Sequence, residues 1–246
     1  MSSSVMITGA STGIGCALAW ELAARGHSLA LTARRLEKLE DIRAGIRQRH
    51  PAVRVEVRAL DVTCYDQITP VLESLAEALD GLDIVVANAG IGLGEKIGQG
   101  QFEKCRRTIE TNLIGAIATV DAAVQYFRAR GQGHIVGISS IMAFRGLQHN
   151  AAYSASKAGL ANYLDAVRVA VRRKHIDVTI FYPGFIDTPL NDMLPHRPFL
   201  ISAEKGARLM ADKMARKVKS SMIPVWPWAL VKWLLRMMPD SVVARL

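Results

Sequence analysis

The chain is short of cysteine, histidine and long apolar runs, and each shortage excludes a class of protein. The three cysteines among its 246 residues, Cys16, Cys64 and Cys105, are scattered, odd in number and without a Cys-x-x-Cys spacing. We therefore expect reduced thiols and no disulfide framework. The six histidines are equally dispersed, which argues against a metal site. No basic and apolar leader opens the chain, so the sequence predicts a cytoplasmic protein.

Positive charge is in excess, but it lacks the clustering of a nucleic-acid binder. The formal net charge is +9, from 31 Lys and Arg against 22 Asp and Glu. The basic residues are spread along the chain, for example at Arg34-Arg35 and Arg172-Arg173-Lys174, and form no single stripe or arm. We interpret them as solvated helix faces and expect no nucleic-acid partner. A preference for anionic substrates or membranes is the alternative.

A glycine-rich turn lies between the first predicted strand, residues 5–8, and a helix predicted over residues 14–25. The next predicted strand, residues 28–33, completes a βαβ unit. In such a unit one glycine permits the tight turn, one lets the backbone approach a pyrophosphate, and one allows close helix–strand packing. Amides at the helix N-terminus favour the anion. The turn therefore predicts dinucleotide binding, by Gly9, Ser11, Thr12, Gly13, Ile14 and Gly15.

The end of the second predicted strand indicates which dinucleotide is bound. Enzymes that prefer NAD usually place an acidic residue there for the ribose 2′-hydroxyl. This chain has Arg34 and Arg35 instead, with no acid before Glu37. A guanidinium suits a 2′-phosphate, so we predict NADP as the cofactor, bound first by Arg34. The alternative is two surface arginines that open the helix over residues 36–49.

Strands and helices alternate along the rest of the chain. Further strands are predicted over residues 53–59, 82–87, 134–139, 176–181 and 222–225. Further helices are predicted over residues 65–79, 102–130, the stretch after residue 153, and 202–217. This order predicts a doubly wound (Rossmann) α/β fold, a parallel sheet flanked by helices in a single domain of residues 1–225. Residues 189–200 lack periodicity and are expected to be a substrate lid.

Tyr153 and Lys157 lie four residues apart on a predicted helix, so they share one face. A free Tyr titrates near about 10, and a cation within a few Å lowers that pKa by favouring the phenolate. Such a phenol can exchange a proton with an alcohol or alkoxide. Ser140, at the end of a predicted strand, could hold the same substrate oxygen. The alternative is a half-buried aromatic beside a solvated lysine.

With these motifs in order, the chain resembles the short-chain dehydrogenases/reductases over residues 5 to about 225. The shared motifs are Thr8-Gly9-x-x-x-Gly13-Ile14-Gly15, Asp61-Val62, Asn88-Ala89-Gly90, Asn112, Ser140, Tyr153-x-x-x-Lys157, Pro183-Gly184 and Thr188. One departure is Ala87, where the family usually has a second asparagine. The resemblance implies NADP-dependent hydride transfer between the nicotinamide and a carbonyl or secondary alcohol. A dinucleotide-binding sensor or scaffold without turnover is the alternative, although such relatives usually lose the Tyr or the Lys.

The resemblance also implies a role for each matching residue. Ser140 would orient the carbonyl, Tyr153 would be the acid–base, and Lys157 would bind the nicotinamide ribose. Asn112 would distort its helix and bind a water linked to Lys157; a surface asparagine is the alternative. The remaining cofactor contacts would come from Asp61 and Val62 at the adenine, from Asn88, Ala89 and Gly90 beside the cofactor, from Pro183 and Gly184 at the nicotinamide, and from Ile186 and Thr188 at the carboxamide and phosphates. Asp61 could equally be a turn residue. Arg145 and His149 are expected to be ordinary loop residues, with contact to the substrate as the alternative.

Residues 226–246 form an apolar, aromatic C-terminal extension that departs most from the family pattern. Its apolar run is far shorter than the ~20 residues that span a bilayer. We predict that it packs on the domain or at the interface of a homodimer or homotetramer, with a membrane-surface contact as the alternative. The substrate is expected to be a small carbonyl or alcohol compound, with a lean toward hydrophobic ones.

Overall fold

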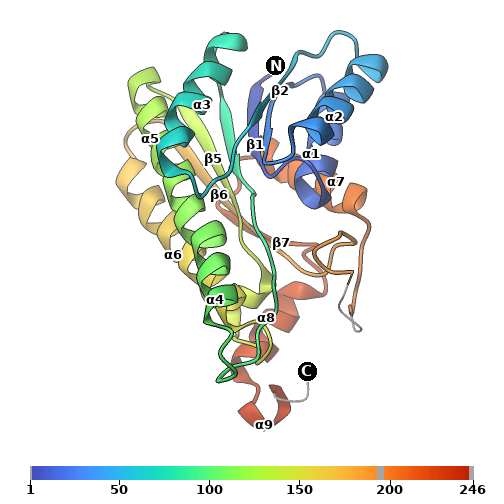
Figure 1. Ribbon diagram of the computed structural model, residues 1–246, viewed down its shortest axis with the longest axis vertical. Coiled ribbons are helices and arrows are strands. Elements are labelled where there is room, and N and C mark those ends of the chain that lie inside the picture. The colour runs from blue at the N-terminus through green and yellow to red at the C-terminus, as the bar shows by residue number, and fades with distance from the viewer. Residues whose placement is uncertain (1, 193–196, 244–246) are drawn as a thin grey trace.

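Seven parallel strands form one sheet between two layers of helices (Figure 1). The computed structural model describes residues 2–192 and 197–243. The strands are β1 Ser4–Thr8, β2 Ser28–Ala33, β3 Val55–Ala59, β4 Ile84–Ala87, β5 Gly133–Ile138, β6 Ile176–Pro183 and β7 Ser220–Ile223, in the order β3-β2-β1-β4-β5-β6-β7. The order reverses between β1 and β4, where ligands of doubly wound sheets bind. The predicted fold class is confirmed.

Two apolar cores, one on each face of the sheet, hold the helices in place. Figure 1 shows α3, α5 and α6 on one face and α1, α2 and α7 on the other. Their bounds are α1 Gly13–Ala24, α2 Leu36–Arg49, α3 Tyr65–Ala78, α5 Gly115–Arg130, α6 Ala151–Val171 and α7 Ala203–Ala215. Successive strand residues point to opposite faces, so Met6 belongs to one core while Val5 and Ile7 belong to the other. Both faces are therefore apolar, as expected of a parallel sheet.

Most predicted strands and helices begin and end within two residues of the observed bounds, and three of the differences have a clear physical reason. The helix predicted over residues 102–130 is interrupted, because a π-helical segment, Glu110–Ile114, separates α4 Phe102–Ile109 from α5. β3 begins at Val55 and not at residue 53, because the Val53 amide bonds to the His50 carbonyl in a turn. β7 ends at Ile223 and not at residue 225, because the next residue, Pro224, has no amide hydrogen to donate to the ladder.

The C-terminal extension forms α8 Trp228–Met237 and the short α9 Asp240–Val243. Trp228, at the start of α8, is buried and contacts the rings of Phe185 and Phe199 edge to face. A Cβ at Gly184 would lie only 2.1 Å from the Trp228 ring, so the glycine makes room for the indole. The inner face of α8 therefore packs on the domain.

The outer face of α8 is apolar and exposed. Leu230, Trp233, Leu234 and Met237 follow one another at spacings of three, one and three, and their exposed fractions range from 49% to 80%. The cations of this helix turn the other way: Figure 1 shows α8 beside the loops that follow the sheet, and there Lys232 and Arg236 lie over the ring of Phe144. The exposed apolar face, which we call the α8 stripe, thus carries no charged side chain.

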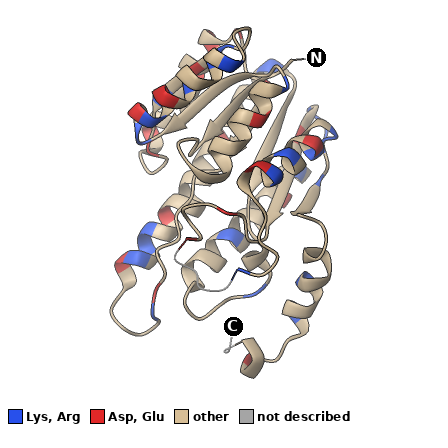
Figure 2. Ribbon diagram, turned by 90° about the vertical axis from the view of Figure 1, so that its right-hand side faces the viewer, with Lys and Arg blue, Asp and Glu red and all other residues tan. Residues whose placement is uncertain are grey.

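Charge elsewhere is mixed. Figure 2 shows blue and red positions interspersed along the helices, and ion pairs such as Arg106–Glu110 and Arg25–Asp212 join opposite signs. Among the helices that the structure describes, none combines the length and the apolar character needed to cross a membrane.

Candidate active site

A cavity of about 740 Å³ lies where the strand order reverses. Its walls come from the segments that follow β1, β2, β3, β4 and β5 and from the end of β6, with further residues from α6. Because the strands are parallel, their carboxyl ends meet at this one edge of the sheet. The fold therefore gathers at one place residues that are far apart in the sequence.

Nearly all the predicted site residues line this cavity. They are Gly9, Ser11, Thr12, Gly13, Ile14, Arg34, Arg35, Asp61, Val62, Asn88, Ala89, Gly90, Ser140, Tyr153, Lys157, Pro183, Gly184, Ile186 and Thr188. Gly15 and Asn112 lie behind the wall instead. A Cβ on Gly15 would be 2.5 Å from Asn88 Nδ2 and 2.6 Å from the Gly9 carbonyl oxygen, so a glycine is required for α1 to approach the strand ends.

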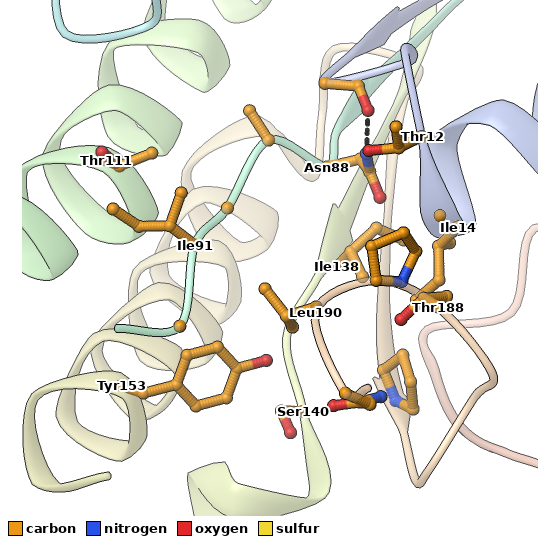
Figure 3. Close-up of a pocket in the computed structure, with 18 of the residues that line it drawn as sticks. Thr12, Ile14, Asn88, Ile91, Thr111, Ile138, Ser140, Tyr153, Thr188 and Leu190 are labelled. Carbon is orange, nitrogen blue, oxygen red and sulfur yellow. Dashed lines mark hydrogen bonds between the residues drawn. The ribbon is translucent and has the colours of Figure 1, made fainter. Parts of the chain in front are cut away.

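The glycine-rich turn is fastened to the loop after β4. Thr8 Oγ1 accepts hydrogen bonds from the amides of Asn88 and Ala89, at 3.1 and 3.2 Å. Asn88 Nδ2 in turn donates to the carbonyls of Thr8 and Gly9, the latter shown as a dashed line in Figure 3. Gly9 has a φ of +67°, and a Cβ there would lie 2.7 Å from Ala89 Cα. The bare backbone of this turn leaves room for a phosphate group, which fits a dinucleotide.

Arg34 and Arg35 are exposed at one end of the cavity. The guanidinium of Arg35 donates to Ser11 Oγ at 3.4 Å, so one arginine already bridges to the glycine-rich turn. Nearby, the Asp61 carboxylate accepts from both the amide and the hydroxyl of Thr63, at 3.0 and 2.8 Å. Asp61 therefore organises a turn, which does not prevent its neighbour Val62 from lining the cavity.

Tyr153, Ser140 and Lys157 converge at the other end of the cavity. Figure 3 shows the Tyr153 hydroxyl directed into the cavity on the side of Ser140, with Leu190 across from the ring. Ser140 follows β5, and its Oγ accepts from the Met142 amide at 3.2 Å. Lys157 is 4% exposed, its Nζ donates to the Ile138 carbonyl at 2.9 Å, and it lies 5.7 Å from the centre of the Tyr153 ring.

Burial changes the pKa of both groups. Desolvation lowers the pKa of Lys157 to about 8, since the charged ammonium loses water. The pKa of Tyr153 is raised, because burial of the phenol outweighs the opposing hydrogen bond to Ser140. The prediction of a lowered phenol pKa is therefore wrong for this structure: the ammonium donates to Ile138 and faces the ring. At neutral pH Tyr153 is a protonated phenol, which is the form that can donate a proton.

Asn112 is fully buried in the π-helical segment, so the alternative of a surface asparagine is wrong. Its side chain brackets one residue of the loop after β4, because Oδ1 accepts from the Ile91 amide at 2.7 Å and Nδ2 donates to the Ile91 carbonyl at 2.8 Å. A Cβ on Gly90 would lie 3.3 Å from Asn112 Oδ1 and 3.4 Å from Lys157 Nζ. Asn112 thus supports the cavity wall beside Lys157.

Several lining residues were not predicted. They are mainly the loop residues Ile91, Gly92, Leu93 and Gly94, with Met142, Asn150 and Phe185. The alternating glycines at 90, 92 and 94 were the available signal. His149 lines the cavity, whereas Arg145 bonds to Met238 and Asp240 on the C-terminal extension. Of the predicted lid, Pro189, Leu190 and Asn191 line the cavity; residues 193–196 of that prediction lie outside the described residues.

In the described parts of the chain no group of three His, Cys, Asp or Glu side chains could hold a metal ion. Cys16, Cys64 and Cys105 are free thiols.

Comparison with known proteins gives relatives along the whole chain. Residues 3–198 match the family model described as short chain dehydrogenase. An uncharacterized oxidoreductase of Mycobacterium tuberculosis is 34% identical over 242 residues, which are 98% of this chain and 96% of the relative. An uncharacterized oxidoreductase of Myxococcus xanthus is 37% identical over 237 residues, which are 96% of this chain and 92% of the relative.

Solved structures give the same picture. The alcohol dehydrogenase of the archaeon Thermococcus sibiricus, complexed with 5-hydroxy-NADP, has a TM-score of 0.81 at 26% identity, over 90% of this chain and 96% of that one. The L-sorbose reductase of Gluconobacter frateurii, complexed with NADPH and L-sorbose, has a TM-score of 0.80 at 28% identity, over 90% of this chain and 94% of that one.

Proposed function

The chain belongs to the short-chain dehydrogenase/reductase family of NAD(P)-dependent oxidoreductases, and on that premise we propose that it is an NADP-dependent carbonyl reductase. The observation that supports this most strongly is the cavity itself. It extends from two arginines after β2, past the glycine-rich turn, to Ser140, Tyr153 and Lys157. An extended dinucleotide laid along it would bring its nicotinamide to the phenol.

The cofactor-binding half of the proposal rests on the residues that would hold NADPH. The turn at Gly9 and Gly13 would hold the pyrophosphate, and Val62 would contact the adenine. Arg34, Arg35 and Ser11 would bind the 2′-phosphate, since a guanidinium can grip a phosphate with two hydrogen bonds. The two solved relatives above carry NADPH or an NADP derivative, which supports the same preference.

Cofactor choice is tested by steady-state kinetics with NADPH and NADH. We expect kcat/KM to favour NADPH, and the variants Arg34→Ala and Arg35→Ala to lower kcat/KM for NADPH about tenfold each while leaving the value for NADH within about twofold. Arg47→Ala, which removes an exposed arginine outside the cavity, is the control. Preference for NADH in the wild type would contradict the proposal.

The chemistry follows from the protonated phenol. Bound NADPH would supply a hydride to the carbonyl carbon. Tyr153 would give its proton to the carbonyl oxygen as that oxygen takes up the electron pair of the C–O double bond. Ser140 would donate a hydrogen bond to the same oxygen, and the Lys157 ammonium would stabilise the phenolate left behind. Asn112 would act through the wall, by holding Ile91.

The substrate class is proposed from the lining around Tyr153. Ile91, Leu93, Met142, Phe185 and Leu190 are apolar and line the cavity, and Figure 3 shows Ile91 and Leu190 beside Tyr153. We therefore propose an apolar ketone or aldehyde. A screen of carbonyl compounds with NADPH deuterated at the transferable position would test this, with transfer of deuterium to the product as the expected result. Binding of NADPH without transfer to any carbonyl would favour a sensor or scaffold instead.

The proposal includes a cytoplasmic homodimer or homotetramer. Free, scattered cysteines support a reducing compartment. The α8 stripe supports self-association, because homodimer interfaces are rich in aromatic residues and methionine and poor in charge. Trp233→Glu should lower the mass measured by light scattering, whereas Ile97→Glu, at another exposed apolar residue, should not. A wild-type monomer, or an unchanged oligomer in Trp233→Glu, would contradict this assignment of the interface.

A further inference from the structure

The N-terminus of α6 is the part of the fold that sets where Tyr153 stands. The residue before the helix, Asn150, makes no capping hydrogen bond with its side chain, and the first turn contains no acidic residue. The first amides of a helix have no partner within the helix and need one from elsewhere. Tyr153 is the third residue of this helix. Whatever satisfies these amides therefore also positions the phenol.

Glu95, which is 57 residues earlier in the chain, is the partner of one of these amides. Its Oε1 accepts from the amide of Ala152, the residue just before Tyr153, at 2.6 Å. Its own amide donates to the carbonyl of His149 at 3.1 Å. Glu95 is 4% exposed, so its carboxylate is held inside the protein at the positive end of the α6 dipole. Two hydrogen bonds of opposite direction thus join Glu95 to the start of α6.

The segment that carries Glu95 also forms the cavity wall against the phenol. A Cβ on Gly92 would lie 3.8 Å from Tyr153 Cδ2, so the loop passes directly beside the ring. Gly94 has a φ of +60°, a left-handed conformation that lets the chain turn back toward α6 immediately before Glu95. The conformation of this loop therefore places the Glu95 carboxylate at the N-terminus of α6.

The other end of this loop is held from the opposite side. Asn112 brackets Ile91 with two hydrogen bonds, and its Nδ2 also reaches Ser156 Oγ at 3.3 Å. Ser156 Oγ donates to the Tyr153 carbonyl at 2.7 Å. Contacts from Asn112 and from Glu95 thus meet at Tyr153 from two sides, through the same short loop.

We propose that Glu95 is a positioning residue, which fixes the Tyr153 phenol by capping α6 from the substrate loop. It does not touch the reacting atoms. Only the expected change in kcat rests on the proposed function, because the hydrogen bond between Glu95 and the Ala152 amide is present whatever the reaction is.

Three variants of Glu95 distinguish the effect of side-chain length from the effect of charge. Glu95→Gln keeps the length of the side chain and an oxygen that can accept, but loses the charge. Glu95→Asp keeps the charge but is shorter by one methylene group, and Glu95→Ala has neither. We expect kcat within about threefold of wild type for Glu95→Gln and a loss of about 10-fold to 100-fold for the other two, because small displacements of a reacting group cost rate on this scale. The dissociation constant of NADPH should change less than about threefold in all three.

A matched control is a helix cap outside the cavity lining. Ser202 Oγ accepts from the Lys205 amide at 3.2 Å at the start of α7, and Ser202 does not line the cavity. Ser202→Ala should lower thermal stability while leaving kcat within about twofold of wild type. If Ser202→Ala lost as much kcat as Glu95→Ala, the effect of Glu95 would be explained by general stability alone, and the proposal would be overturned.

Exchange of the Ala152 amide hydrogen, measured by NMR, tests the contact without any activity. We expect faster exchange in Glu95→Asp and Glu95→Ala than in wild type and in Glu95→Gln. Should the alanine variant not fold, the glutamine and aspartate variants decide. Equal exchange in those two, or equal kcat, refutes the role of Glu95. Slow exchange in the wild type without carbonyl reduction would instead refute the proposed function and leave the cap standing.

Discussion

Raising the pH above about 8 should lower activity and stabilise the fold at the same time, because Lys157 loses its proton in this range. Lys157 is 4% exposed, and the hydrogen bond from its amine to a neutral acceptor, the Ile138 carbonyl, does not replace the lost water. Burial lowers the pKa from 10.5 to about 8. About nine tenths of the lysine is then charged at about pH 7, and about one tenth at about pH 9.

The activity follows the charged form. Without its cation, the site can no longer stabilise the phenolate that Tyr153 becomes when it donates its proton. We expect kcat/KM for NADPH, which reports the free enzyme, to fall toward a tenfold loss per pH unit above about 8. The pKa of Tyr153 is raised, so the phenol keeps its proton through this range and does not produce the decline.

Stability moves in the opposite direction. The folded pKa of Lys157 lies below the unfolded value of 10.5, so the unfolded chain binds more protons between about pH 8 and about pH 10.5. The free energy of unfolding therefore rises with pH across this interval. At about 1.4 kcal/mol per pH unit, the gain attributable to Lys157 is about 3 kcal/mol.

Urea unfolding of the wild type and of Lys157→Met, at a series of pH values, isolates this contribution, since methionine has a similar length and no charge. The difference in unfolding free energy between the two proteins should change by about 3 kcal/mol in favour of the wild type as the pH rises. A kcat/KM that stays flat to about pH 9.5, or a difference in stability that does not depend on pH, would refute this account of Lys157.

Three further outcomes are expected. Gly9 has a positive φ, and a Cβ at this position would press on the backbone after β4. Gly9→Ala should therefore weaken NADPH binding at least about tenfold by fluorescence titration. Gly146→Ala, at a glycine with open space around it, should not weaken binding. His134 is buried, and burial lowers its pKa to about 4. As the pH falls from about 6.5 to about 4, the unfolded chain takes up a proton that the folded protein does not, so the wild type should lose about 3 kcal/mol of stability relative to His134→Gln. Gly184→Ala should cost about 1–3 kcal/mol in chemical denaturation, because its Cβ would overlap the Trp228 ring, and Trp228→Leu should partly restore the loss.

Sequence patterns were sufficient for the architecture because each predicted element carries its own signal. The glycine-rich turn, the apolar strands and the alternation with helices all act over short stretches of chain, and they led to the doubly wound fold class and to most of the predicted residues that line the cavity. Strand ends were less predictable. At residue 53 a turn hydrogen bond competes with the ladder, and at residue 224 a proline ends it.

What escaped prediction depends on contacts between distant segments. Glu95 looks like an ordinary loop carboxylate until α6 is placed beside it, because its partner is 57 residues away. The pKa of Tyr153 was predicted in the wrong direction. Spacing on a helix predicts that Lys157 is near, but it predicts neither the burial of the phenol nor the hydrogen-bond acceptor of the ammonium.

The indole behind Gly184 has a consequence for the order in which the protein is made. Among the described residues, all those that line the cavity lie at or before Asn191, and they leave the ribosome before Trp228 does. Until then the wall at the end of β6 lacks the ring that packs against Gly184 and Phe185, although every residue proposed for chemistry has already been synthesised. A nascent chain that stalls in this interval would possess all the proposed catalytic residues and still lack the indole that fills the space behind Gly184.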